Sequence, residues 1–134
     1  QPEGCATVAG PLTRNEKRAQ AVTCTSEISG LQVASVLDAQ IAVDAALASK
    51  GSGQMMSDEL IYSWQARLIR EEGIYTEPAG ATALVGLELA LKKGLLNPDE
   101  KVVCLVTGGG FKHLDSIDTL LKDSPMPLID VGEI

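Results

Sequence analysis

Aromatic and basic residues are scarce in this sequence. Four of its 134 residues are aromatic, and eighteen Asp and Glu outnumber eleven Lys and Arg, for a formal net charge of −7. Nucleic-acid binding needs basic surface and aromatic platforms on which bases stack, so we expect no nucleic-acid partner. The longest unbroken apolar runs are about five residues, against the roughly 20 that cross a bilayer, so we expect no membrane association.

Histidine and cysteine are also rare. His113 is the only histidine, and Cys5, Cys24 and Cys104 are an odd number of cysteines at wide spacings. This pattern favours neither a closed disulfide framework nor a C-x-x-C site, and no cluster offers the three or four ligands that zinc needs. We therefore expect no metal site, a reducing cytoplasmic compartment, and a Cys104 that acts as a small buried hydrophobe.

The remaining composition is typical of a folded domain. Apolar residues make up 45% of the chain and charged residues 22%, and a chain of this length suffices for one domain with its own core. The sequence starts at Gln1, without Met and without a signal-peptide pattern. We expect a piece cut from a longer chain, with a processed mature N-terminus as the alternative.

The periodicity of apolar residues predicts four helices. Lys50 and Gly51 supply a stop for the first helix, and Ser57 is a favourable N-cap for the second. Pro78 stands in the first turn of the third, where its missing N–H costs nothing. The predicted helices run over residues 33–49, 57–73, 77–94 and 115–122. Residues 1–30 are expected to be irregular, and their basic cluster is interpreted as a solvated helix face, with a phosphate contact as the alternative (Arg14, Lys17 and Arg18).

A valine-rich run predicts a strand over residues 101–106. Continuous apolar character is typical of a strand covered on both faces in a parallel sheet, and shorter strand candidates lie at Gln54–Met56 and Ile74–Thr76. Helices alternating with strands indicate an α/β fold. The nearly all-apolar third helix and the buried strand need a larger sheet than these residues provide.

The strongest local candidate for a ligand site is the loop at residues 107–112. Three consecutive glycines follow the strand directly, at the end where open α/β sheets bind ligands. The loop matches neither the Rossmann fingerprint nor the P-loop, so a tight structural turn and a ligand loop both remain open. Glu77, at the start of the third helix, is either a partner of the helix dipole or a group that points into a cleft.

Taken together, these elements resemble one enzyme family. The segment Gly73–Ala81 (G-I-Y-T-E-P-A-G-A), at its distance from Thr107–Lys112 (T-G-G-G-F-K), resembles the C-terminal part of threonine synthases. More broadly it is similar to the pyridoxal-phosphate enzymes of the tryptophan synthase β-subunit fold type. Further similar segments lie at residues 1–6, 27–33 and 93–100, so the resemblance covers roughly residues 1–120.

The resemblance implies a fold and an organisation. It implies that residues 1–134 are a single C-terminal segment of the large cofactor domain, which has three layers of helix, parallel sheet and helix, with residues 123–134 as a tail. In this family the Schiff-base lysine and the phosphate loop lie N-terminal to the matched region. No catalytic residue is therefore expected in this segment, Lys112 is not assigned as the Schiff base, and the isolated segment is expected to be inactive.

The resemblance also implies cofactor contacts. Thr107 matches the hydroxyl residue that bonds the pyridine nitrogen of pyridoxal phosphate, and Gly108 lets the loop close on the ring edge. Glu77 matches a carboxylate near the ring, and Ser29 with Gly30 match the segment beside its face. A hydroxyl donor leaves the ring largely neutral, which favours elimination and replacement over transamination.

The expected activity of the intact protein is that of a lyase of amino-acid biosynthesis. Phosphate elimination and replacement on O-phosphohomoserine is the leading hypothesis, with a small amino-acid substrate and a possible homodimer. Phe111 and His113 depart from the commoner Leu and Asp of threonine synthases, which leaves the substrate open. The alternatives are a serine/threonine dehydratase or another β-replacement enzyme of the same fold type, or a self-standing α/β domain that binds a small anion or dimerises.

Overall fold

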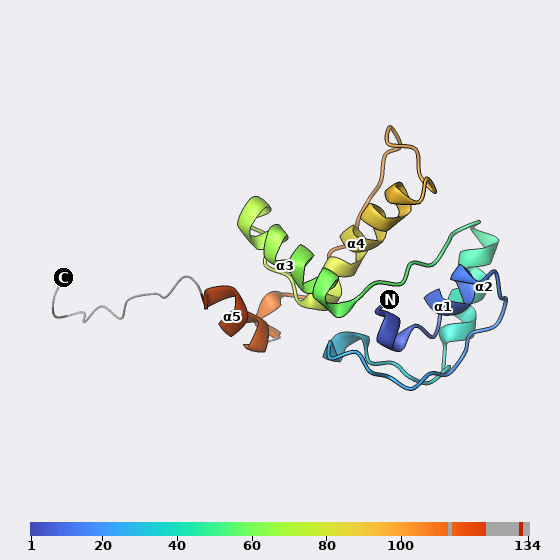
Figure 1. Cartoon of the computed structure of the whole chain (residues 1–134), viewed down its shortest axis with the longest axis horizontal. Helices are drawn as coiled ribbons and strands as arrows, with labels where there is room; N and C mark the ends of the chain where they lie inside the picture. Colours follow the sequence, from blue (N-terminus) through green and yellow to red (C-terminus); the bar gives the residue numbers. More distant parts are fainter. Residues whose placement is uncertain (113, 123–131, 133–134) are drawn as a thin grey trace.

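The computed structural model describes residues 1–112, 114–122 and 132. Helices α3 and α4 lie side by side in the middle of the molecule, with α1 and α2 toward one end and α5 toward the other (Figure 1). None of the described helices has the length and apolarity needed to cross a bilayer. The helices are α1 (Ala9–Thr13), α2 (Ala39–Ala48), α3 (Asp58–Glu72), α4 (Pro78–Lys92) and α5 (Leu114–Leu121), and the 3₁₀ turns are η1 (Glu3–Cys5), η2 (Ser29–Leu31) and η3 (Gly110–Lys112).

Local signals place both ends of α3 as predicted. The Ser57 hydroxyl oxygen accepts the N–H of Leu60 at 3.3 Å, which satisfies one free donor of the first turn. Asp58 and Glu59 add negative charge where the helix dipole favours it. The helix ends at Gly73, whose φ of +68° is a left-handed conformation that glycine adopts without strain.

Helix α4 also confirms its prediction. Pro78 is its first residue, and Glu77 precedes it in an extended conformation. At the other end the chain leaves the helix through Lys93 and Gly94, which has a φ of +66°. The predicted fourth helix corresponds to α5. His113 lies outside the described residues, and so does the predicted tail at 123–134 except for Gly132.

The core lies where α3 and α4 pack against each other. Its buried members come from both helices and from the loops that precede them (Ile28, Met56, Ile61, Leu68, Ala81 and Val85). At the rim, the indole N–H of Trp64 donates to Glu88 Oε2 at 2.5 Å. Ion pairing with Lys92 and this hydrogen bond hold the pKa of Glu88 below its usual value.

The prediction of an apolar helix face over residues 33–49 was wrong. Helix α2 begins only at Ala39, because Ala34 is already used elsewhere: its carbonyl accepts the N–H of Val22 at 3.0 Å. Within the helix Val43 is fully buried, whereas Ile41, which the periodicity assigns to the buried face, is 69% exposed. A contact distant in sequence therefore moved the helix start and changed the face that is covered.

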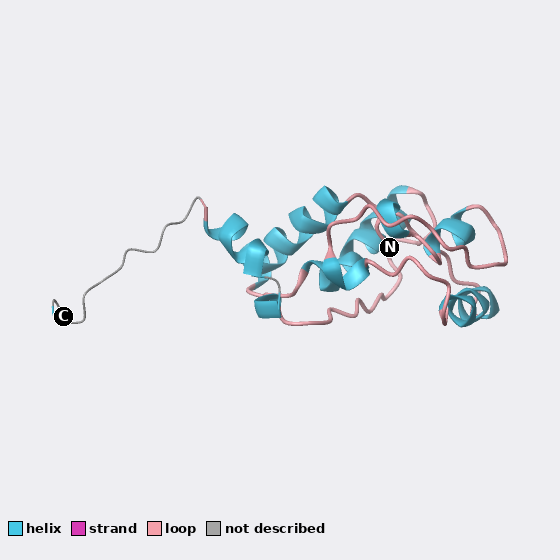
Figure 2. Cartoon of the chain, turned by 90° about the horizontal axis from the view of Figure 1, so that it is seen from below, coloured by secondary structure: helices cyan, strands magenta, loops and turns pink. Residues whose placement is uncertain are grey.

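The strand predicted over residues 101–106 is extended but unpaired within the described part of the chain. Val103 is 86% and Leu105 75% exposed, and Cys104 is half-buried rather than buried, with its thiol 3.8 Å from the carbonyl oxygen of Ala83 on α4. The described residues contain no strand, as Figure 2 shows, and the short strand candidates reduce to single bridges, Pro2 with Met56 and Thr76 with Gly109. A strand needs a neighbouring backbone to pair its N–H and C=O groups, and no described segment lies beside this one in that way.

The burial difference between two isoleucines provides a test. Replacing Ile61, which is fully buried in the core, with Ala should lower the free energy of unfolding by about 2–5 kcal/mol, because it leaves a cavity. The matched variant Ile41→Ala should change it by no more than about 0.5 kcal/mol, since this side chain is mostly in solvent. Urea unfolding followed by circular dichroism measures both, and equal losses would contradict the described burial.

Candidate functional site

The glycine loop is held against the start of α4 by hydrogen bonds to its backbone. The N–H of Glu77 donates to the carbonyl oxygen of Gly108 at 3.1 Å, and the N–H of Gly110 donates to that of Tyr75 at 3.1 Å. The hydroxyl of Thr76, a residue only 2% exposed, lies 2.7 and 2.8 Å from the carbonyl oxygens of Thr107 and Gly108. Segments about thirty residues apart in the sequence are therefore in direct contact.

Two glycines make this contact possible. A Cβ on Gly80 would lie 2.0 Å from Thr76 Oγ1 and 2.1 Å from the carbonyl oxygen of Thr107, so any side chain there would push the loop away from α4. Gly108 has a φ of +67°, and a Cβ on it would lie 1.8 Å from Glu77 Oε1. The backbone of the loop thus contacts the helix start at distances that only glycine permits.

The structure brings Thr107, Gly108 and Glu77 together. The Glu77 side chain is half-buried and lies along Gly108, whereas Thr107 is exposed. The hydroxyl of Thr107 has no hydrogen-bond partner among the described residues, although its carbonyl is held by Thr76. The loop is therefore fixed through its backbone, and it presents a free hydroxyl beside a carboxylate.

Gly30 approaches the same end of α4 from another direction. A Cβ on Gly30 would lie 3.2 Å from the Cβ of Ala79, in the first turn of the helix. Both Gly30 and the preceding Ser29 are exposed. Ser29 reaches this region through its neighbour Gly30, and no described interaction joins it to Thr107 or Glu77.

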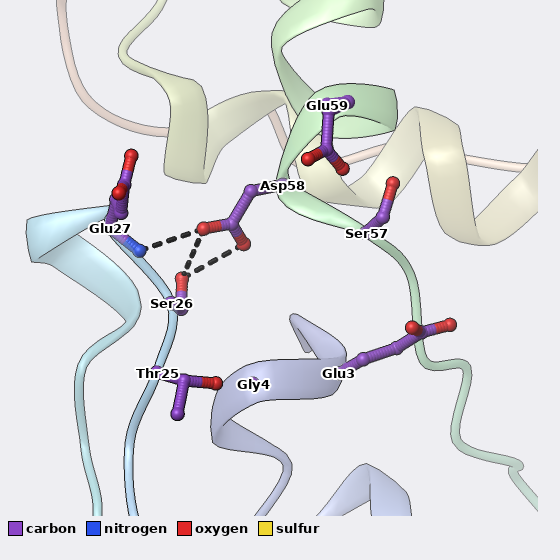
Figure 3. A pocket seen from close by; sticks show the side chains of 8 residues that line it. All are labelled: Glu3, Gly4, Thr25, Ser26, Glu27, Ser57, Asp58 and Glu59. Carbon is purple, nitrogen blue, oxygen red and sulfur yellow. Dashed lines mark hydrogen bonds between the residues drawn. The ribbon is translucent and has the colours of Figure 1, made fainter.

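A carboxylate at the start of α3 holds the segment that leads to Gly30. The hydroxyl of Ser26 lies 2.9 and 3.0 Å from the two carboxylate oxygens of Asp58, and the N–H of Glu27 donates to Asp58 Oδ2 at 2.7 Å (Figure 3). Ser26 is buried. These bonds determine where η2 emerges beside α4.

The cavity beside the bonds of Ser26 and Glu27 to Asp58 (the Asp58 clamp) is acidic. It has a volume of about 530 Å³, and four carboxylates line it (Glu3, Glu27, Asp58 and Glu59). Negative charge repels an anionic phosphate, so this cavity is unsuited to the phosphate of a cofactor. The described residues also contain no group of three or more His, Cys, Asp or Glu side chains arranged to hold a metal ion.

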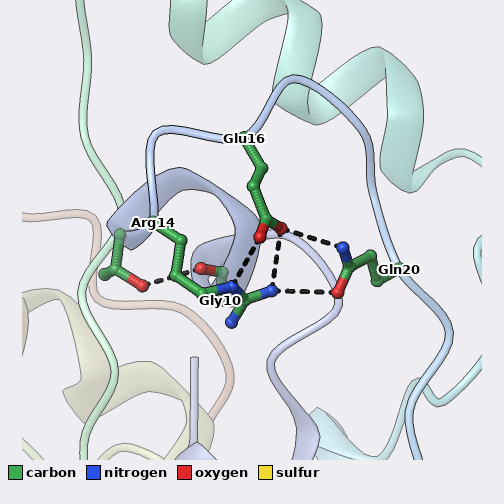
Figure 4. A network of polar contacts seen from close by, with 5 residues as sticks. Gly10, Arg14, Glu16 and Gln20 are labelled. Carbon is green, nitrogen blue, oxygen red and sulfur yellow. Dashed lines mark hydrogen bonds and ion pairs between the residues drawn. The ribbon is translucent and has the colours of Figure 1, made fainter.

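The basic residues near the N-terminus do not form a helix face. Arg14 follows the short helix α1, which the sequence did not predict, and its guanidinium donates to the Glu16 carboxylate at 2.9 and 3.0 Å (Figure 4). It also donates to Gln20 Oε1 at 2.9 Å. Hydrogen bonding to Glu16 raises the pKa of Arg14 and lowers that of its partner. Because Arg14 already has an anionic partner, the structure gives no support to the phosphate alternative at this residue.

Aromatic packing supports the far side of the glycine loop. The rings of Tyr75 and Phe111 meet edge to face, with centroids 5.0 Å apart. Gly110 lies against the Tyr75 ring, where a Cβ would come within 2.3 Å of its carbon atoms. The Tyr75 hydroxyl is buried and has no hydrogen-bond partner in the described part of the molecule.

Thr76 and Gly80 are the positioning residues that sequence reasoning missed. For Gly80 a signal existed, because an isolated glycine inside a helical pattern indicates close packing against another backbone. Thr76 offered none, since its partners are the carbonyl groups of residues 107 and 108. Only the folded chain reveals that its hydroxyl holds the loop.

Comparison with known proteins agrees with this arrangement. The family model described as "Pyridoxal-phosphate dependent enzyme" matches residues 1–108. The chain therefore belongs to the pyridoxal-phosphate-dependent enzymes, an α/β family whose cofactor is pyridoxal phosphate. The resemblance found in the sequence is confirmed at this level.

Curated proteins similar to this chain include several threonine synthases. The enzyme of Methanocaldococcus jannaschii is 36% identical over 88 residues, which are 66% of this chain and 22% of that protein. The enzyme of Mycobacterium bovis is 39% identical over 97 residues (69% and 26%), and that of Methanosarcina acetivorans 36% over 105 residues (78% and 23%). The chain spans about a quarter of the length of the relatives that it matches.

Two glycines on the same helix test the contact that holds the loop. Gly80→Ala should lower the free energy of unfolding by about 1–3 kcal/mol, because the added methyl collides with the Thr76 hydroxyl and the loop carbonyl. Gly86→Ala has open space around it and should raise that free energy by up to about 1 kcal/mol, since Ala favours helix. Urea unfolding measures the free energy of unfolding of both variants. A Gly80→Ala variant that is as stable as the wild type would contradict the crowding at Gly80.

Proposed function

We propose that the protein containing this chain is a threonine synthase-like lyase that uses pyridoxal phosphate. Residues 1–134 form a C-terminal segment of its cofactor domain, and the Schiff-base lysine and the phosphate loop lie outside this segment. The substrate is a small amino acid, with O-phosphohomoserine as the leading candidate. The names of the relatives and the match to the family model over residues 1–108 support this assignment.

The observation that carries the proposal is the free hydroxyl of Thr107, on the glycine loop beside the start of α4. Its carbonyl is held by Thr76, so the residue has a defined position, yet its side chain is exposed and has no hydrogen-bond partner among the described residues. A pyridine nitrogen needs one donor in the plane of its ring. The glycines that follow leave the adjoining backbone free of Cβ atoms, so the residues present fit the pyridine edge of the cofactor.

When bound, pyridoxal phosphate supplies an electron sink for the bonds at the substrate Cα. The Thr107 hydroxyl donates a hydrogen bond to the ring nitrogen without giving up its proton, because its own acidity is far too weak. A neutral donor such as Thr107 would leave the nitrogen largely neutral, which would moderate the electron sink and favour elimination and replacement. An Asp carboxylate at this position would instead stabilise the protonated, positively charged form of the nitrogen.

The other site residues shape the surroundings of the ring. Glu77 lies beside Gly108 at the start of α4, so its carboxylate is adjacent to the Thr107 loop. Gly30 and Ser29 offer exposed backbone without a bulky side chain next to Ala79. We assign these residues to orientation of the ring, and none of them to proton transfer at the substrate.

The exposed segment at residues 101–106 supports completion of the domain by further strands. A hollow of about 360 Å³ is lined by Gln54, Met56 and Val102–Cys104, together with residues of α4. Apolar side chains on an unpaired extended segment favour pairing with another strand. We propose that the intact protein forms a parallel sheet here, with helices on both of its faces.

Assembly and location are proposals of the same kind. The three cysteines are free thiols, which is compatible with a reducing, cytoplasmic compartment. A homodimer is the assembly that we propose for the intact protein.

The activity of the intact protein tests the proposed reaction. With pyridoxal phosphate and O-phosphohomoserine, we expect water to be consumed and one threonine and one phosphate to be released for each substrate molecule. Threonine is measured by amino-acid analysis and phosphate by a colorimetric assay. Formation of a 2-oxo acid from L-serine or L-threonine, without turnover of O-phosphohomoserine, would support the dehydratase alternative instead, and no turnover of any of these would contradict the proposal.

Substitutions at Thr107 test its role at the ring nitrogen. Thr107→Val keeps the shape but removes the donor, so the affinity of the intact protein for pyridoxal phosphate should fall about tenfold. Thr107→Ser retains the hydroxyl and should stay within about threefold of the wild type. Titration of the visible absorbance of the bound cofactor measures both affinities. Equal affinities for the two variants would show that the hydroxyl makes no such bond.

A further inference from the structure

Two segments near the N-terminus of the chain run side by side in opposite directions. The N–H of Thr25 donates to the carbonyl oxygen of Gly4 at 2.8 Å, and the N–H of Gln20 donates to that of Thr7 at 3.1 Å. From the first pair to the second, the residue number increases on one segment, from 4 to 7, and decreases on the other, from 25 to 20, so the two segments are antiparallel. The segments touch closely, because a Cβ on Gly4 would lie 2.6 Å from Thr25 Oγ1.

Cys5 and Cys24 are neighbours of the hydrogen bond between Gly4 and Thr25, one on each segment. The thiol of Cys24 is a close enough neighbour of Cys5 to affect the pKa of Cys5. Cys5 follows Gly4 and Cys24 precedes Thr25, so the bond between Gly4 and Thr25 brings the two cysteines to neighbouring positions, as a disulfide requires. A bond between the two sulfur atoms therefore requires little movement of the backbone.

The two thiols differ in their access to solvent. Cys5 is 0% exposed, whereas Cys24 is half-buried. Burial, and the adjacent Cys24 thiol, raise the pKa of Cys5 to about 11, so at neutral pH Cys5 is almost entirely protonated and a poor target for a dissolved oxidant. A dissolved oxidant therefore meets Cys24 first, and Cys5 is in place to react with the product.

We propose that Cys5 and Cys24 form a reversible disulfide in the intact protein when it encounters a peroxide. Hydrogen peroxide transfers one oxygen atom to the sulfur of Cys24, giving a sulfenic acid and one water molecule. The sulfur of Cys5 then attacks that of Cys24, the S–O bond breaks, and the hydroxide leaves with the Cys5 proton as a second water molecule. The protein loses two hydrogen atoms, and a dithiol reductant returns both thiols.

The disulfide would join η1 to the segment that leads to the candidate site. Beyond Cys24 this segment is held by the Ser26 hydroxyl on Asp58, and it then reaches Gly30 beside the first turn of α4. The disulfide would attach this segment to η1 at Cys24, two residues before Ser26 is held by Asp58. Oxidation therefore fixes the segment at two points without involving a residue assigned to the cofactor.

Mass spectrometry of the intact protein tests this pairing. The full-length protein is treated with hydrogen peroxide, the remaining thiols are alkylated, and the digest is compared before and after reduction. We expect a peptide pair linked through Cys5 and Cys24, lighter by two hydrogen atoms than the sum of its parts, which disappears on reduction. Cys104, on a different segment beside α4, serves as the internal comparison.

Variants separate this pairing from general oxidation. Cys104→Ser should leave the linked pair unchanged, whereas Cys24→Ser should abolish it and leave the Cys5 peptide reduced. Circular dichroism confirms that each variant is folded, and Cys24→Ala replaces Cys24→Ser if the latter is not. Overoxidation of Cys24 without a link to Cys5, or its linkage to any other cysteine, would overturn the proposal.

Discussion

The arrangement of the candidate site depends on one buried threonine. The hydroxyl of Thr76 contacts the carbonyl oxygens of Thr107 and Gly108, and its own carbonyl accepts a hydrogen bond from the buried side chain of Gln65 on α3 at 2.8 Å. Three parts of the molecule thus meet at this residue: α3, the start of α4 and the glycine loop. Removing the hydroxyl would leave the Thr107 carbonyl without this partner, which costs more than the bond itself contributes, whereas the Gly108 carbonyl would keep the N–H of Glu77.

The helices were predictable wherever their signals are local. The cap at Ser57 and the left-handed Gly73 act within one turn of α3, and Pro78 acts within the first turn of α4, so the sequence suffices to place these ends. The start of α2 was not predictable, because the hydrogen bond from Val22 to Ala34 joins residues twelve positions apart. The prediction of a strand over residues 101–106 depended on a distant partner in the same way. These residues have the composition of a strand, but pairing requires a second backbone, and composition does not show whether one is present.

The site shows the same division. The resemblance predicted that Thr107, Gly108 and Glu77 belong together, and the structure places them in contact, although their roles toward the cofactor remain proposals. Gly30 lies beside Ala79 at the start of α4, and the assignment of Ser29 to the cofactor stays a prediction. The contribution of Thr76 and the proximity of Cys5 to Cys24 could not be deduced, since both arise from backbone pairings between distant segments.

The attachment of the glycine loop separates its shape from the group that it presents. Its shape rests on carbonyl oxygens, on the Thr76 hydroxyl and on the absence of a Cβ at Gly80, none of which depends on the side chain of residue 107. Mutation at that one position could therefore exchange the donor while the scaffold around it persists. In evolutionary terms, the electronic character of the reaction can drift independently of the architecture, so enzymes with different chemistries can descend from one ancestral loop.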